Sequence, residues 1–138
     1  MPANQLKNLL IAEDNSGVAE TMVMTLQLFN YHISAVVSRA DEAIQKAQEL
    51  KPDLVIMDVM LGDHTDGIHA GRHIQKTLSI PVLYVTGYRE KAASLEREGA
   101  VPLLKPFNAN DLKIAIGAIF YTLSLRYPER KPLTPDGP

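Results

Sequence analysis

Three carboxylates and one lysine stand at positions where they could do chemistry together. Each follows a short apolar run of the kind that forms a buried parallel strand: Glu13 and Asp14 after residues 9–12, Asp58 after 54–57, and Lys105 after 101–104. In an open α/β sheet, ligands bind just outside the carboxyl ends of the strands, so we expect these groups to meet. Carboxylate oxygens suit a hard divalent cation such as Mg²⁺, and a lysine beside them suits a phosphate. The combination indicates an aspartate that carries a phosphoryl group.

The hydrophobic pattern predicts the elements that would position these groups. Short apolar runs alternate with longer amphipathic segments, which indicates repeated strand–helix units around a parallel sheet. Strands are expected at residues 7–12, 32–37, 53–57, 81–85 and 101–104. Helices are expected at residues 16–29, 40–50, 67–78, 89–98 and 109–125. Ser16 is the expected N-cap of the first helix, and Asn108 or Asn110 that of the last.

Length and composition indicate a single domain. The chain has 138 residues, of which 46% are hydrophobic, and we expect a domain at residues 1–125 with a proline-rich tail at 126–138. The net charge of −2 gives no electrostatic reason to bind nucleic acid or a membrane surface. No apolar run approaches the roughly 20 residues of a membrane span. The absence of cysteine excludes disulfides and suits the reducing cytoplasm, where we expect the protein.

Together, the motifs resemble the receiver domain of two-component response regulators, in a single-domain form similar to the chemotaxis regulators. The resemblance covers about residues 6 to 124 and is carried by Glu13-Asp14, Asp58, Asp66-Gly67, Pro81-Val82, Thr86-Gly87, Gly99-Ala100 and Lys105-Pro106-Phe107. It implies a doubly wound, flavodoxin-like α/β fold with five parallel strands in the order 2-1-3-4-5; the alternation alone gives only a parallel sheet. It also implies a cis peptide bond between Lys105 and Pro106, which aims the lysine inward.

The resemblance implies a Mg²⁺ site made of four residues. Asp14 and Asp58 would hold the cation directly, and the main-chain carbonyl of Met60 would be the third protein ligand. Glu13 would act through a bound water, because Mg²⁺ usually keeps several waters and takes only one or two carboxylates. Acids placed together without a cation would repel one another at a cost.

The same resemblance places the phosphoryl group on Asp58, since a carboxylate can attack phosphorus and form an aspartyl phosphate. Phosphoryl transfer depends mainly on in-line placement and on neutralising the equatorial oxygens. Lys105 would pair with the phosphoryl group as a point charge, and the Thr86 hydroxyl would hydrogen-bond to it. Gly87 would leave room for the group and Met60 would lie beside it. The expected catalytic residues are therefore Asp58, Thr86 and Lys105.

The chain departs from the family pattern near the site. The segment after Asp58 lacks the usual proline near Gly62 and is about one residue longer, so this loop is expected to differ in shape. Pro102 stands where the family commonly has a rotating aromatic residue, so the usual aromatic switch is not expected. Met60 and Tyr88 stand where polar side chains could orient a hydrolytic water. Met60 cannot do so and Tyr88 is bulky, which predicts a comparatively long-lived phosphoryl group.

The sequence therefore predicts a phosphorylatable switch that catalyses only its own Mg²⁺-dependent phosphotransfer and dephosphorylation. A sensor histidine kinase or phosphotransfer protein would donate to Asp58, and an unknown downstream protein would recognise the result by direct contact. Two alternative functions remain, a hydrolase and a degenerate receiver. A small hydrolase with an aspartyl-phosphate intermediate needs a second aspartate two residues after the nucleophile, where Met60 stands. A degenerate receiver that only binds proteins would have lost an acid, the threonine or the lysine, and none is lost.

The expected fifth helix carries more apolar residues than one buried face needs. A helix that covers a sheet needs an apolar stripe of ~100° or slightly more. That stripe can be formed by Leu112, Ala115, Ile116, Ile119 and Leu123. A second stripe, directed away from it, is formed by Ile114, Ala118, Tyr121 and Leu125. Exposed apolar patches often mark interfaces, which predicts a homodimer through this helix about a two-fold axis. The alternative is that the tail folds back over the patch.

Overall fold

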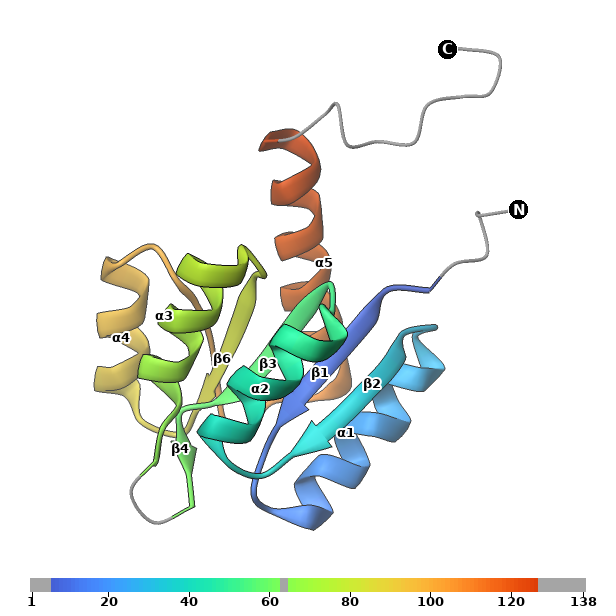
Figure 1. Ribbon diagram of the computed structural model, residues 1–138, viewed down its shortest axis with the longest axis horizontal. Helices are drawn as coiled ribbons and strands as arrows, with labels where there is room; N and C mark the ends of the chain where they lie inside the picture. The colour runs from blue at the N-terminus through green and yellow to red at the C-terminus, as the bar shows by residue number, and fades with distance from the viewer. Residues whose placement is uncertain (1–5, 63–64, 127–138) are drawn as a thin grey trace.

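The computed structural model describes residues 6–62 and 65–126. Its centre is a five-stranded parallel sheet with helices on both faces (Figure 1). The predicted doubly wound fold is therefore confirmed, and so is the expected strand order. The predicted proline-rich tail at residues 126–138 lies outside the described residues apart from Arg126. Within the described ranges, no helix is long and apolar enough to cross a membrane.

The strands of the sheet lie side by side in the order β2, β1, β3, β6 and β7. Their bounds are β1 Asn8–Ala12, β2 His32–Val37, β3 Leu54–Asp58, β6 Val82–Thr86 and β7 Val101–Leu104. All neighbouring pairs are parallel. Strands β3 and β6 are buried along their whole length, which explains why their sequences are continuous apolar runs. Because the strands are parallel, their carboxyl ends share one edge of the sheet.

Four helices connect these strands, a fifth follows the last strand, and together they form a layer on each face. Their bounds are α1 Ser16–Leu28, α2 Ala40–Leu50, α3 Gly67–Leu78, α4 Arg89–Arg97 and α5 Ala109–Arg126. Helices α1 and α5 cover one face, and α2, α3 and α4 cover the other (Figure 1). All five lie within a residue or two of the predicted ranges.

Alternate residues of each strand supply the two halves of the hydrophobic core. In β1, Leu9 and Ile11 pack beneath α1 and α5, whereas Leu10 and Ala12 pack beneath α2, α3 and α4. A strand that points successive side chains to opposite faces needs apolar residues at every position when both faces are covered. The predicted inner stripe of α5 is buried at Leu112, Ile116 and Ile119.

Side-chain caps fix where two of the helices begin. The prediction of Ser16 as the N-cap of α1 was wrong by one residue, because Asn15 has the extended backbone of a cap and accepts a hydrogen bond from the Val18 amide at 2.9 Å. Of the two asparagines expected at the start of α5, Asn108 is the cap. Its side chain accepts from the Asp111 amide at 2.7 Å, and the Asp111 carboxylate accepts from the Asn108 amide at 3.0 Å.

A short antiparallel pair of strands, β4 (Met60–Leu61) and β5 (Thr65–Asp66), follows β3 and is not predicted by the sequence pattern. It occupies the segment in which the chain departs from the family. The residue after the pair must be glycine, since a Cβ on Gly67 would lie 2.1 Å from the carbonyl oxygen of Asp58. The Gly67 amide also donates to the Val59 carbonyl at 2.9 Å. The Asp66-Gly67 motif thus allows α3 to begin directly against the end of β3.

Candidate functional site

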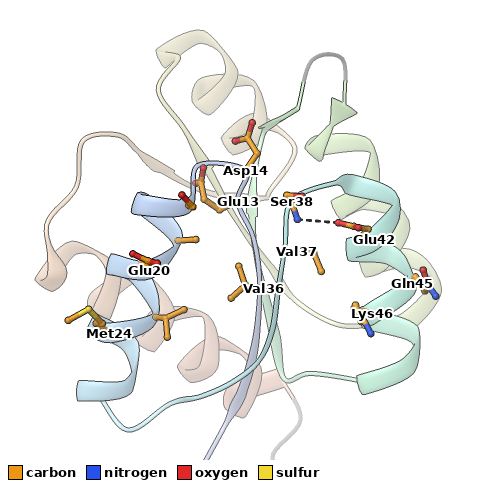
Figure 2. A pocket seen from close by; sticks show the side chains of 13 residues that line it. Glu13, Asp14, Glu20, Met24, Val36, Val37, Ser38, Glu42, Gln45 and Lys46 are labelled. Carbon is orange, nitrogen blue, oxygen red and sulfur yellow. Dashed lines mark hydrogen bonds between the residues drawn. The ribbon is translucent and has the colours of Figure 1, made fainter.

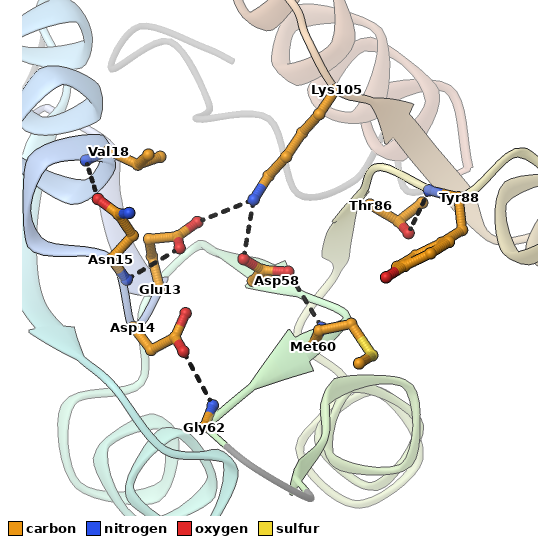
Figure 3. Close-up of polar contacts among 10 residues, drawn as sticks. All are labelled: Glu13, Asp14, Asn15, Val18, Asp58, Met60, Gly62, Thr86, Tyr88 and Lys105. Carbon is orange, nitrogen blue, oxygen red and sulfur yellow. Dashed lines mark hydrogen bonds and ion pairs between the residues drawn. The ribbon is translucent and has the colours of Figure 1, made fainter.

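Three carboxylates meet at the carboxyl edge of the sheet (Figure 3). Glu13, Asp14 and Asp58 each offer an oxygen, and these oxygens lie within 4.8 Å of one another. Glu13 and Asp14 directly follow β1 and Asp58 ends β3. The two strands are neighbours, with Ala12 paired to Met57. The structure therefore brings together all three acids that the sequence places at strand ends.

Glu13 is the most buried of the three acids, with 3% of its surface exposed. Its Oε2 accepts a hydrogen bond from the Asn15 amide at 3.1 Å. Its Oε1 forms an ion pair with Lys105 Nζ at 3.5 Å but has no hydrogen-bond partner in the described part of the chain. Burial, together with the neighbouring Asp58 carboxyl, raises the pKa of Glu13 from 4.5 to about 7. The fold therefore disfavours the ionised form of Glu13.

Asp58 is buried and held from two sides (Figure 3). Its Oδ1 accepts a hydrogen bond from the Met60 amide at 3.0 Å, and its Oδ2 pairs with Lys105 Nζ at 3.0 Å. The pairing of β3 with β6 sets Asp58 opposite Val85. These contacts fix the carboxylate in one orientation, with a backbone donor on one oxygen and a cation on the other.

Asp14 is the exposed member of the cluster and lies on the side away from Lys105 (Figure 3). Its Oδ2 accepts a hydrogen bond from the amide of Gly62 at 3.1 Å. Gly62 follows β4 and has a φ of 62°, a backbone conformation that favours glycine. The contact joins the end of β1 to the β4–β5 pair, so the unpredicted strands form part of the site.

Lys105 enters the site from the end of β7. The Lys105–Pro106 peptide bond is cis, as the resemblance implied. The Lys105 amide donates to the Thr86 carbonyl at 2.7 Å, which anchors the lysine main chain to β6. Burial lowers the pKa of the Lys105 ammonium, but its hydrogen bond to Asp58 and the negative charges of Asp58 and Glu13 outweigh that effect and leave the pKa raised from 10.5. The lysine therefore stays protonated.

Thr86 and Gly87 lie beyond Asp58 on the neighbouring strand end. Thr86 is buried, and its hydroxyl oxygen accepts a hydrogen bond from the Tyr88 amide at 3.1 Å. Accepting that bond leaves the hydroxyl proton available for an anion. A Cβ on Gly87 would meet nothing within 4 Å, so the space beside the threonine is open. Tyr88 and Met60 are half-exposed at the rim of the site.

The residues of this edge fit a divalent cation and an anion together. Carboxylate and main-chain carbonyl oxygens are the ligands that Mg²⁺ takes in proteins. The buried Glu13 Oε1 lacks a hydrogen bond that a cation's water could supply. On the other side, the Lys105 ammonium and the Thr86 hydroxyl can donate to a phosphoryl group. Asp58 lies between the two, where a nucleophilic carboxylate is needed.

Two amides of the site are not predicted from the sequence. Asn15 donates to Glu13 and Gly62 donates to Asp14, so both support acids that were predicted. Asn15 is recognisable in the sequence only as a capping residue. Gly62 stands out only as a glycine in the segment that departs from the family pattern.

Comparison with known proteins agrees with this arrangement. The response regulator receiver domain family matches residues 9–117, which is most of the chain. The chain belongs to the response regulator receiver domain family.

The receiver is similar in sequence to parts of longer regulators. It is 30% identical over 129 residues to the phyllosphere-induced regulator PhyR of Methylorubrum extorquens, covering 91% of this chain and 48% of that protein. It is 34% identical over 113 residues to the transcriptional regulatory protein PdtaR of Mycobacterium tuberculosis, covering 80% of this chain and 55% of that protein. The receiver thus spans about half the length of these curated relatives.

Solved structures with the same fold include other receiver domains. The signal receiver domain of a modulated diguanylate cyclase from Desulfovibrio desulfuricans G20 matches with a TM-score of 0.79 at 26% identity, over 88% of this chain and 99% of that one. The receiver domain of the PhyR response regulator from Erythrobacter litoralis matches with a TM-score of 0.77 at 25% identity, over 86% of this chain and 93% of that one.

Proposed function

We propose that this receiver is a signalling switch that accepts a phosphoryl group on Asp58 from a phosphohistidine. The proposal rests on the surroundings of Asp58. Lys105 Nζ lies 3.0 Å from one Asp58 oxygen, and Glu13 and Asp14 each place an oxygen within 4.8 Å of an Asp58 oxygen. A buried carboxylate between an ammonium and a cation-binding cluster is suited to hold a phosphoryl group, because both neighbours neutralise the added charge.

Mg²⁺ is the cation that this donor set favours. Asp14 and Asp58 would hold it directly with the Met60 carbonyl, and Glu13 would hold it through water. When bound, Mg²⁺ stabilises the charge on the phosphoryl oxygens. Its binding also favours the ionised form of Glu13, whose pKa burial raises, so the cluster binds cations more weakly as the pH falls through that value.

The reaction is a transfer of one phosphoryl group between two side chains. An oxygen of Asp58 attacks the phosphorus, the bond from phosphorus to the donor imidazole nitrogen breaks, and the electron pair leaves with the imidazole. Lys105 transfers its contact from the carboxylate to a phosphoryl oxygen. The Thr86 hydroxyl donates a hydrogen bond to another of these oxygens, and the open space beside Gly87 accommodates the group.

A groove beside Lys105 suits the phosphohistidine donor. It has a volume of about 560 Å³ and lies between α1 and the segment that follows β7. Apolar side chains of Val18, Met22 and Phe107 line it. A sensor histidine kinase or phosphotransfer protein seated there would bring its imidazole close to Asp58. Concave, mostly apolar surfaces with a few polar groups are common binding sites.

The downstream signal is proposed to pass by protein contact, with a homodimer through α5 as one form of it. The outer stripe of α5 is exposed at Ile114, Ala118, Tyr121 and Leu125. Ile114, Tyr121 and Leu125 are each more than 60% exposed. Exposed apolar stripes of this kind are typical of interfaces, and a two-fold axis would pair the same stripe on both copies.

The rival functions fit the described residues less well. A hydrolase with an aspartyl intermediate needs an acid/base carboxylate at Met60, whose half-exposed thioether side chain cannot transfer a proton. A degenerate receiver would lack part of the Asp58, Lys105 and Thr86 set. We therefore propose no turnover beyond the receiver's own phosphotransfer and dephosphorylation. The proposal includes a cytoplasmic location, which the cysteine-free sequence suits.

The test uses phosphoramidate, a small donor with a phosphorus–nitrogen bond like that of phosphohistidine. Phosphorus NMR of the wild type with phosphoramidate and Mg²⁺ should show a protein-bound acyl phosphate resonance that disappears when EDTA is added first. Failure of that resonance to form with Mg²⁺ would overturn the proposal. Repeated turnover of p-nitrophenyl phosphate at the same protein concentration would favour the hydrolase instead.

A further inference from the structure

A second groove runs along the outer edge of the sheet, between α1 and α2 (Figure 2). Its volume is about 950 Å³, and edge strand β2 forms its floor. One end of the groove reaches Glu13 and Asp14. The rest is built from residues that play no part in the proposed phosphotransfer.

The groove exposes apolar side chains that are not packed into the hydrophobic core. Met24 of α1 is 66% exposed, and Val36 of β2 is 44% exposed. Val23 lies partly buried beside them. Val36 pairs with Ile11 and so faces the α1 side of the sheet, but α1 leaves it uncovered. These side chains form an apolar strip that burial against another molecule would stabilise.

The rim of this strip is acidic. Glu20 on α1 and Glu42 on α2 line opposite walls, and Asp14 lies at the end of the groove (Figure 2). Among the described residues, Lys46 is the one basic side chain that lines the groove, and it is paired with Glu49 at 3.3 Å. The net charge of the lining therefore favours a cationic occupant.

The shape of β2 argues against an occupant that extends the sheet. The register between β1 and β2 shifts between Leu9 and Leu10, so that Ile33 and Ala35 are paired but Ser34 is not. Bulges of this kind interrupt the regular row of backbone groups that a new strand would need. An occupant of this groove would therefore be recognised through its side chains.

We infer that this groove docks a segment of a partner protein that carries lysine or arginine beside aliphatic side chains. The aliphatic side chains contact Met24 and Val36, and the cationic ones reach Glu20 and Glu42. The inference is independent of the proposed phosphotransfer, because none of these four residues contributes to the Asp58 cluster.

The test begins with selection from a displayed library of random peptides of about 12 residues, enough to span a groove of this kind. The library is first depleted on the double variant Glu20→Lys/Glu42→Lys and then selected on the wild-type chain. We expect enriched peptides with a net charge of about +2 or more beside aliphatic residues, because the rim is acidic. No enrichment, or enrichment of acidic peptides, would overturn the inference.

The most enriched peptide is then synthesised and titrated by NMR. It should shift the methyl resonances of Met24 and Val36, and the double variant should weaken its affinity by about tenfold or more. A matched charge reversal on α4, Glu90→Lys/Glu96→Lys, should leave the affinity unchanged. Shifts confined to α5, or equal losses in both variants, would contradict the assignment.

Sedimentation of the chain without peptide tests the other occupant. A dimer of the wild type that Val36→Lys dissociates would assign the groove to a second copy of the receiver and overturn the inference. Retention of the same oligomeric state in Val36→Lys supports it.

Discussion

The two helix layers of the receiver cover the same sheet but differ in what they show to solvent. The α2, α3 and α4 layer is charged: α4 has five charged residues among nine, Arg89, Glu90, Lys91, Glu96 and Arg97. Helix α1 has one charged residue, Glu20, among thirteen. The helices also differ in the large apolar side chains that are more than a third exposed. Helices α1 and α5 carry six of them: Val18, Met24, Leu28, Ile114, Tyr121 and Leu125. The helices of the other layer carry one, Leu50.

The difference indicates that the layers have separate tasks. Both bury enough apolar surface to hold the sheet, as the two halves of the core show. The α1 and α5 layer keeps six large apolar side chains in contact with water, against one in the other layer, and this exposure costs free energy unless another protein covers it. The reactive groups belong to neither layer, because they follow the strands. We therefore expect the proposed chemistry at the strand ends and the proposed protein contacts mainly on the α1 and α5 layer.

The largest expected effect separates the strand ends from the helix layers. Asp14→Ala should abolish Mg²⁺-dependent phosphorylation while the fold survives, because Asp14 is exposed and its one hydrogen bond within residues 6–62 and 65–126 is to the Gly62 amide. The measurement is acyl phosphate formed in a fixed time at saturating Mg²⁺, with circular dichroism as the control for folding. Glu20→Ala on α1 is the matched acid removal and should leave phosphorylation unchanged. Full phosphorylation of Asp14→Ala would contradict the metal assignment.

The next prediction tests the contrast between the layers directly. Ile114→Glu/Tyr121→Glu should dissociate the proposed homodimer, since two charges buried at an interface cost about 3 kcal/mol or more, which is over a hundredfold in Kd. Sedimentation velocity across a concentration series measures the change. Leu50→Glu, on the other layer, should leave the dimer intact. A wild type that stays monomeric at high micromolar concentration, phosphorylated or not, would rule the dimer out.

A smaller effect concerns the raised pKa of the buried Glu13 carboxyl. Folding raises the pKa of Glu13 from 4.5 to about 7, so between these values the folded chain holds a proton that the unfolded chain has released. The free energy of unfolding should therefore fall, by about 2–3 kcal/mol at most, as the pH rises through this window. Urea titrations without metal, from about pH 5 to about pH 8, should show this fall in the wild type relative to Glu13→Gln.

The test depends on whether the free energy of unfolding falls or rises with pH. Added Mg²⁺ should recover the stability at the alkaline end, because the cation neutralises the ionised carboxyl. A wild type whose stability rises with pH relative to Glu13→Gln would show that burial and Asp58 do not raise the pKa of Glu13.

The smallest expected effect lies at the rim of the site. Met60 and Tyr88 are half-exposed there and offer no carboxylate or amide that would orient a water in line with the phosphorus. Met60→Asn/Tyr88→Glu should shorten the half-life of the phosphoryl group, because a polar side chain there can hold a water in line with the phosphorus. The half-life is measured after removal of the donor. An unchanged or longer half-life would exclude these positions as the cause of a slow hydrolysis.

The sequence predicts those parts of the fold that depend on neighbouring residues. Continuous apolar runs identified β1, β3 and β7, and the charged residues at the ends of these three strands predicted where the acids and Lys105 meet. For α5 the sequence narrowed the cap to Asn108 or Asn110, and the hydrogen bonds with Asp111 identify Asn108. For α1 the sequence offers two adjacent capping residues, Asn15 and Ser16, and Ser16 was the wrong choice. The cis bond before Pro106 came from the resemblance alone.

Other features depend on contacts that the local sequence does not encode. Each strand of the β4–β5 pair has only two residues, too few to show an alternating hydrophobic pattern. Asp14 contacts this pair although it lies far from it in the sequence. The raised pKa of Glu13 follows from burial and from Asp58. The exposure of Met24 and Val36 depends on how far α1 extends over the edge of the sheet, so the acidic groove could not be predicted.

The central claim is that Asp58 accepts the phosphoryl group. The most direct test is incubation of the whole chain with Mg²⁺ and acetyl phosphate, followed by intact mass spectrometry of the wild type and of Asp58→Asn. The account predicts that the wild type gains the mass of one phosphoryl group, and that Asp58→Asn, which keeps the size of the side chain but removes the nucleophilic carboxylate, gains none. A wild type that gains no mass, or an Asp58→Asn variant that gains as much as the wild type, would contradict it.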